Sequence, residues 1–277
     1  MGVFAISLYH HCRRNFSFNY HYQSCRTLIL QSAFESVRVQ RLSHDDSGIV
    51  EVHLDRPEAK NAIGKEMLRG LQNIFEAINR DASANVVMLS SSVPRVFCAG
   101  ADLKERKTMN PSETRFFVNS LRSTFSLLEA LHVPTIAVIE GAALGGGLEM
   151  ALSCDLRIVG WWNSKTFKIG WKINCKGTHI TGRKVGGRDA MSVGLVNYCV
   201  PAGEAHLKAL EIAQHINQKG PLALRMAKRA INEGLELDME SALALEEECY
   251  EQLLNTKDRL EGLAAFAEKR KPRYNGE

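Results

Sequence analysis

Residues 135–153 pass from a β-rich stretch through three consecutive glycines into a helix-forming stretch. The pattern predicts a buried strand from Thr135 to Ile139, a turn at Gly145-Gly146-Gly147 and a helix through Leu148 to Ser153. Glycines let backbones approach closely, and the first N–H groups of a helix have no partner inside it. The segment therefore predicts a β/α unit whose turn either packs tightly or holds a ligand.

The same alternation of strand and helix extends over most of the chain. We expect a hairpin from residues 37–42 and 49–54, helices over 65–80 and 111–131, and strands over 86–89 and 156–159. After Pro201 only helices are expected, over 203–218, 221–235, 239–254 and 258–269. Crossover-length spacers favour parallel β-α units. The prediction is an α/β core over residues 35–200, followed by a helical region over 201–277.

The amino terminus has the composition of an organelle-import sequence. Residues 1–34 carry Arg13, Arg14 and Arg26, several serines and no acidic residue before Glu35. The alternative is a disordered tail that carries no targeting signal.

The cysteines and the apolar runs bear on the compartment. Seven cysteines without a C-x-x-C pair fit a reducing compartment and argue against a zinc site. No apolar run approaches the roughly 20 residues that span a bilayer, so we expect a soluble protein.

A second small-residue segment, Val96 to Glu105, follows the strand predicted at 86–89. Small side chains around Gly100 would let an amide N–H point outward towards a ligand. The glycine turn before Glu149 would add further N–H groups and the positive end of a helix dipole. Both segments have a purely structural alternative, in which glycine serves only close packing.

Taken together, F-x-A-G-A-D-L-K-E ending at Glu105 and G-x-A-L-G-G-G-L-E ending at Glu149 resemble the paired signatures of the enoyl-CoA hydratase/isomerase (crotonase) superfamily. The resemblance also covers L-D-R-P-E-A-K-N-A at 54–62 and runs from Val37 to Glu277 with one gap. It implies a ClpP-like β-β-α spiral core with a C-terminal helical oligomerisation region.

The resemblance also implies roles for individual residues. The backbone N–H groups of Ala101 and Gly146 would form an oxyanion hole for a CoA thioester, and Glu149 would be the first of two catalytic glutamates that activate water. Residues expected near the CoA are Lys60, Ala99, Asp102, Leu103 and Lys104. The alternatives are that the two lysines are solvated surface residues and that Glu149 is a structural residue, although the position of Glu149 just after the three glycines favours catalysis. No metal and no separate cofactor are expected, because CoA is part of the substrate.

The gap falls at residues 161–180. There the family has a P-E pair with the second glutamate and then P-G-x-G-G-T-Q-R-L-x-R, whereas this chain has a shorter, lysine-rich stretch. One back-translation of Trp162 to Ile180, read one base later, gives G-T-Q-R-L-S-R-L-V-G-R-S-I-A-K-E-L-I. We therefore hypothesise that about one exon is absent and that the frame recovers at Thr181, which the transcript sequence would test.

The implied function is hydration of 2-enoyl-CoA in mitochondrial fatty-acid β-oxidation or branched-chain amino-acid breakdown, impaired by loss of the second glutamate. An isomerase is the nearest enzymatic alternative. Two others stay open: an RNA-binding homologue, since one subgroup of the family binds AU-rich RNA, and a non-catalytic splice-variant subunit. The resemblance further implies a homotrimer or hexamer, a location in the mitochondrial matrix and no membrane partner.

Overall fold

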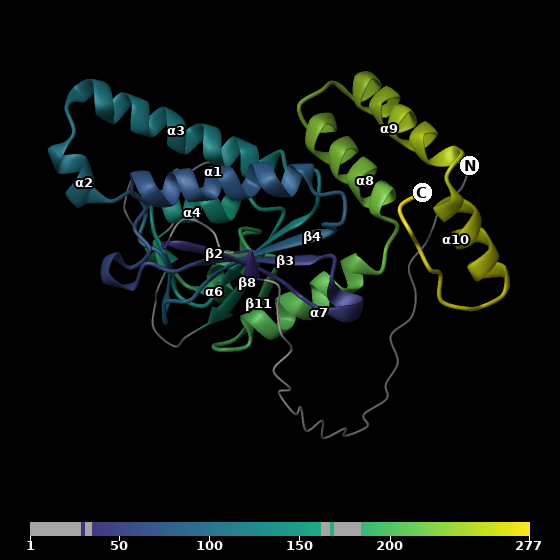
Figure 1. The fold of residues 1–277 in the computed structure, drawn as a ribbon, viewed down its shortest axis with the longest axis horizontal. Helices are drawn as coiled ribbons and strands as arrows, with labels where there is room; N and C mark the ends of the chain where they lie inside the picture. The colour runs from purple at the N-terminus through teal and green to yellow at the C-terminus, as the bar shows by residue number, and fades with distance from the viewer. Residues whose placement is uncertain (1–28, 31–34, 162–166, 169–183) are drawn as a thin grey trace.

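The computed structural model describes residues 29–30, 35–161, 167–168 and 184–277 (Figure 1). Its main sheet has seven strands in the order β1-β2-β3-β4-β6-β8-β11. The first two pairings are antiparallel and the other four are parallel. The strands are β1 (Ile29–Leu30), β2 (Val37–Arg41), β3 (Ile49–Leu54), β4 (Val86–Ser91), β6 (Thr135–Ile139), β8 (Leu156–Trp161) and β11 (Tyr198–Pro201).

Two smaller pairings lie outside the main sheet. The parallel pair β5 (Val96–Cys98) and β7 (Ala142–Ala143) follows two of the main strands along the chain. The antiparallel pair joins β9 (Phe167–Lys168), inside the 161–180 stretch, to β10 (Lys184–Val185), just after it. Most of that stretch, and most of the predicted import sequence, lie outside the described residues.

Helices cover both faces of the main sheet (Figure 1). The larger core lies under α1 (Lys65–Arg80), α3 (Pro111–Glu129) and α4 (Gly146–Leu152), where Phe75, Phe97 and Leu128 are fully buried. The smaller core lies under α7 (Ala205–Asn217). The short helix α2 (Leu103–Thr108) lies between β5 and α3 along the chain, and the short helix α6 (Gly187–Ser192) lies between β10 and β11. The predicted α/β fold class is thereby confirmed.

Helix α7 lies close to the sheet because its inner face is made of alanine. Ala205, Ala209 and Ala213 recur every fourth residue and are fully buried. A buried carboxylate anchors its first turn: Glu51 Oε1 of β3 lies 2.8 Å from His206 Nε2, and Glu51 Oε2 lies 3.2 Å from His53 Nε2. Helix α7 is thus attached to the sheet by small-residue packing and by one buried polar cluster.

This cluster predicts a specific loss of stability in acid. Burial alone would raise the pKa of Glu51, but hydrogen bonds from His206 and His53 outweigh it and hold the pKa at about 2, below the ordinary 4.5. A carboxyl with a lowered folded-state pKa stabilises the fold above its unfolded pKa, and this contribution disappears as the pH falls from 4.5 towards 2. It amounts to about 3 kcal/mol.

Glu51→Gln is therefore expected to lower the thermal unfolding midpoint at neutral pH and to flatten its dependence on pH between 4.5 and 2. Thermal melts of both proteins across that range make the comparison. A variant that retains the full acid sensitivity of the parent would show that other carboxylates control acid unfolding.

The chain ends in three helices that extend beyond the sheet (Figure 1). They are α8 (Pro221–Gly234), α9 (Met239–Leu254) and α10 (Lys257–Ala267). Helices α8 and α9 pack against each other, and large apolar side chains on these helices and their connections face solvent, including Leu235 at 79%, Met239 at 75% and Phe266 at 87% exposure. Contiguous exposed apolar side chains are characteristic of surfaces that contact another protein or a membrane.

Candidate active site

The two glycine-containing turns of the sequence lie side by side in the structure. Strands β5 and β7 pair in parallel, so the turn after Cys98 and the turn after Ala143 leave the same end of this pair. Leu144 N–H donates to Cys98 O at 3.0 Å, which ties the two turns together. The predicted oxyanion residues therefore come from neighbouring backbone segments.

Three glycines make this approach possible. Gly100 and Gly145 have φ values of +89° and +48°, which side chains disfavour. A Cβ on Gly100 would lie 2.6 Å from Leu144 O, and one on Gly147 would lie 2.4 Å from Cys98 O. Helix α4 thus starts in direct contact with the backbone of β5, and only glycine fits at the contact.

Two backbone amides converge at this junction. Within the part of the chain that the structure describes, neither Ala101 N–H nor Gly146 N–H donates to a protein acceptor. The position of a Cβ on Gly146 would be 3.8 Å from Ala101 N, 3.9 Å from Glu149 Oε2 and 3.7 Å from Leu121 Cδ2. The structure therefore brings Ala101, Gly146 and Glu149 together, with an apolar wall from α3.

Such an arrangement can stabilise negative charge on a carbonyl oxygen. Two preorganised N–H donors that meet one oxygen lower the free energy of an enolate-like state, by around 3 kcal/mol each. Gly146 is also the first residue of α4, where the helix dipole adds positive potential. The carboxylate of Glu149 is half-buried beside these donors and is placed to take part in proton transfer.

The other residues expected near a CoA group differ in their exposure to solvent. Lys60, Leu103 and Lys104 are exposed and lie on the loops and the short helix that flank Ala101. Ala99 is half-buried and its N–H donates to Lys60 O at 3.1 Å. Asp102 differs: its carboxylate is 7% exposed, pairs with Arg56 Nη1 at 2.9 Å and accepts from the N–H groups of Lys104 and Glu105.

Sequence reasoning did not single out Arg56, Asn61 or Leu121. Asn61 is fully buried, with φ of +54°, and its side chain bridges Ser91, Phe97 and the Arg56 N–H. The signal was available in the L-D-R-P-E-A-K-N-A segment, because asparagine is among the residues that tolerate left-handed backbone. Leu121 gave no such signal, since it belongs to an ordinary amphipathic helix.

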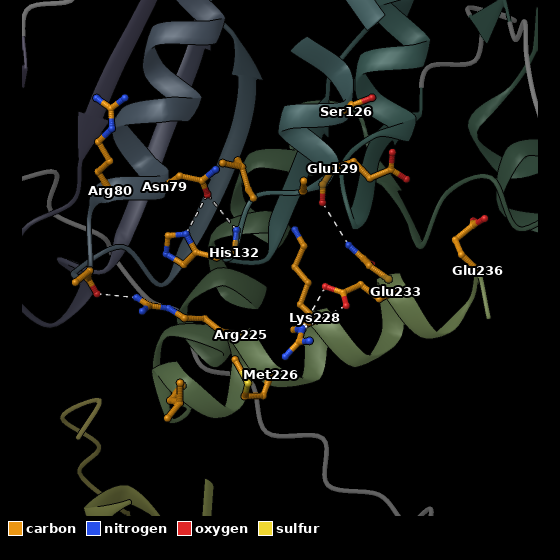
Figure 2. A pocket seen from close by; sticks show the side chains of 16 residues that line it. Asn79, Arg80, Ser126, Glu129, His132, Arg225, Met226, Lys228, Glu233 and Glu236 are labelled. Atoms are coloured by element: carbon orange, nitrogen blue, oxygen red, sulfur yellow. Dashed lines mark hydrogen bonds and ion pairs between the residues drawn. The ribbon is translucent and has the colours of Figure 1, made fainter. Parts of the chain in front are cut away.

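A separate cleft of about 1150 Å³ lies between the C-terminal ends of α1 and α3 and helix α8 (Figure 2). Asn79 and His132 are hydrogen-bonded on one wall, and Arg225 and Lys228 come from α8. Lys228 Nζ donates to Val133 O at 2.9 Å and to Asp155 Oδ2 at 2.8 Å, which fastens α8 to the core. The lining includes none of Ala101, Gly146 and Glu149, so this cleft is separate from the junction of the two glycine-containing turns.

Two features are absent among the described residues. No group of three or more histidine, cysteine, aspartate or glutamate side chains there is arranged to hold a metal ion. None of the described helices combines the length and apolar character that a bilayer-spanning helix needs.

Comparison with known proteins identifies the family. The family model for enoyl-CoA hydratase/isomerase matches residues 44–171 and 168–277. A probable mitochondrial enoyl-CoA hydratase 2 from Arabidopsis thaliana is 58% identical, over 93% of this chain and 92% of its own length. A mitochondrial methylglutaconyl-CoA hydratase from Mus musculus is 40% identical, over 88% of this chain and 84% of its own.

The family match falls into two parts. These parts overlap at residues 168–171, inside the 161–180 stretch. The alignment with the Arabidopsis protein extends over 277 positions but takes in only 93% of a chain that itself has 277 residues. Some aligned positions therefore have no residue in this chain.

The fold gives the same assignment. The crystal structure of an enoyl-CoA hydratase from Bacillus anthracis superposes with a TM-score of 0.82 at 38% identity and covers 88% of this chain and all of its own. A second hydratase structure, from Geobacillus kaustophilus, gives a TM-score of 0.80 at 28% identity over 91% of this chain and all of its own. With both signature turns in place, this chain belongs to the enoyl-CoA hydratase/isomerase family and has the crotonase fold.

Proposed function

We propose that the protein binds 2-enoyl-CoA thioesters and hydrates them only weakly, because it retains one of the two catalytic glutamates. The observation that carries the proposal is a pair of amides, Ala101 N–H and Gly146 N–H, that have no acceptor among the described residues and lie beside the carboxylate of Glu149. In this mechanism the thioester oxygen accepts from both amides, and the β-carbon becomes open to attack by water.

The proposed weakness lies in the proton transfers. Water addition needs a group that takes a proton from water and a group that delivers one to the α-carbon. In the family, two glutamates carry out these transfers. If about one exon is absent, as hypothesised above, this chain lacks the segment that would hold the second glutamate, and residues 161–180 stand in its place. Two findings support the hypothesis: the family match breaks there, and the alignment with the Arabidopsis relative contains positions that this chain lacks. Loss of one acid/base group costs about 10²- to 10⁴-fold in rate.

The names of the relatives support a cellular setting for this chain. The Arabidopsis and mouse proteins are named as mitochondrial enzymes, so we propose the mitochondrial matrix as the location and residues 1–34 as the import sequence. Fatty-acid or branched-chain amino-acid breakdown is the proposed pathway class. The exposed apolar side chains Leu235, Met239 and Phe266 support a homotrimer or hexamer assembled through the helical region.

Binding can be tested separately from turnover. We expect the purified chain to bind a saturated short-chain acyl-CoA, measured by titration calorimetry, because the oxyanion amides need only a thioester oxygen. Free CoA, which lacks that oxygen, is the control and is expected to bind more weakly. Equal affinity for both, or no binding of either, would contradict a thioester site at Ala101 and Gly146.

A further inference from the structure

The loop at residues 55–63 lies directly under the first oxyanion amide. Ile63 and Ala101 form an isolated parallel bridge: Ile63 N–H donates to Gly100 O at 2.7 Å, and Asp102 N–H donates to Ile63 O at 2.9 Å. The backbone is thereby held on both sides of Ala101. The loop and the turn at Ala101 are thus joined by one isolated β-bridge.

The bond to Gly100 O decides where the Ala101 N–H points. Gly100 C=O and Ala101 N–H belong to the same planar trans peptide, so they point in opposite directions. Because Ile63 N–H holds the carbonyl on the loop side, the N–H is turned to the other side, towards Gly146. Any rotation of this peptide would remove one oxyanion donor.

A charged brace joins the two sides of this bridge. Arg56 Nη1 donates to Ala62 O at 2.9 Å and lies 2.9 Å from Asp102 Oδ2. Ala62 precedes Ile63, and Asp102 follows Ala101, so one guanidinium group spans the residues on both sides of the pairing. A guanidinium can hold two acceptors at once in a fixed geometry.

Asp102 is fixed on its other side as well. Its Oδ1 accepts from the N–H groups of Lys104 at 2.9 Å and Glu105 at 3.2 Å, as the N-cap of α2. Burial would raise the pKa of this carboxyl, but the hydrogen bonds from Glu105 and Lys104 and the charge of Arg56 lower it overall. The carboxylate is thus charged at neutral pH, and α2 and Arg56 hold it from opposite directions.

We propose that the Arg56–Asp102 ion pair is a positioning device for catalysis, which keeps the Ala101 N–H aimed at the thioester oxygen. This inference rests on the proposed function, since it assigns a role in the same oxyanion hole. Neither side chain needs to touch the substrate. The pair acts through the Gly100–Ala101 peptide.

The test uses light absorption by a bound conjugated thioester, because hydrogen bonds to its carbonyl oxygen polarise the double bonds and shift the absorption to longer wavelength. The probe is cinnamoyl-CoA, and the affinity is measured in the same titration. Asp102→Asn keeps an oxygen that can cap α2 but removes the charge that holds Arg56. We expect it to lose most of the red shift while the Kd rises by less than about tenfold.

Two further variants complete the design. Glu58→Gln is the matched control, because it removes the other carboxylate on Arg56, 3.0 Å from Nε and 69% exposed, and is expected to leave the red shift unchanged. Arg56→Lys keeps the charge without the fork and is expected to lose most of the shift. It replaces Asp102→Asn as the deciding variant if that protein does not fold, as judged by its thermal melt.

The outcomes separate the two proposals. If the parent chain binds cinnamoyl-CoA with a red shift and the deciding variant keeps the whole shift, the positioning role is wrong while the thioester site stands. If the parent chain does not bind the probe, the proposed function fails and the positioning role fails with it. Loss of the shift with retained binding supports both.

Discussion

A chain in which residues 161–180 are replaced by a segment with the P-E pair and the P-G-x-G-G-T-Q-R-L-x-R run that the family resemblance implies is expected to hydrate a short 2-enoyl-CoA about 10²- to 10⁴-fold faster than the parent. The physical reason is the return of a second carboxyl group that shares the proton transfers with Glu149. The measurement is the loss of absorbance of the conjugated thioester at matched enzyme concentration, with folding checked by thermal melt.

The control for this replacement carries glutamine in place of the restored P-E glutamate. It has the same added length and the same packing but no second acid/base group, so the gain in rate should disappear. If the glutamine version is as fast as the glutamate version, the gain comes from repaired folding and not from proton transfer. If neither is faster than the parent, the missing segment does not limit the reaction.

Gly147→Ala is expected to destabilise the protein by about 3 kcal/mol or more, because the new methyl group has no room. Its Cβ would lie 2.4 Å from Cys98 O and 2.6 Å from Cys98 Cβ, so α4 must move away from β5. Thermal or denaturant unfolding gives the loss of stability. Displacement of α4 also moves the Gly146 N–H, and acyl-CoA binding should weaken in parallel.

Gly234→Ala is the matched control for this substitution. It also lies in a helix, but the nearest atom to its new Cβ would be Ala242 Cβ at 3.7 Å, an ordinary contact. Inside a helix, alanine is more stabilising than glycine by about 0.5–1 kcal/mol, so this variant should be as stable as the parent or slightly more stable. Equal effects of the two substitutions would contradict close packing of α4 on β5.

The sequence predicted the long elements well because each carries a full period of hydrophobic residues. The expected bounds of β3, β6, α1 and α9 coincide with the structure, and those of α3, α7 and α8 differ by two residues or fewer at each end. The short elements were not predicted. Strands β5 and β7 have three and two residues, too few to show alternation.

Helix α2 escaped prediction for a different reason. Its six residues are mainly polar and none is buried, so it has no apolar face. Its start was nevertheless readable, because Asp102 is a good N-cap residue and its side chain does cap the helix in the structure. A helix stabilised by its cap and by neighbouring charges is invisible to a search for hydrophobic periodicity.

The site was predictable in part. The two turns carry dense motifs that single out Ala101, Gly146 and Glu149, and the structure brings these three residues together. The supporting loop was not predictable in the same way, because its role depends on contacts between residues about 40 positions apart, such as Arg56 with Asp102 and Asn61 with Phe97. Such contacts follow from the strand order of the folded sheet, not from local pattern.

The most direct test is the rate at which the unaltered chain hydrates a short 2-enoyl-CoA, measured beside that of the Arabidopsis relative. This rate decides whether the protein binds thioesters with only one of two catalytic glutamates or is a complete hydratase. We predict saturable binding with a rate about 10²- to 10⁴-fold below that of the relative. Comparable rates for the two proteins would contradict this account, because Glu149 would then need no partner from the segment that differs.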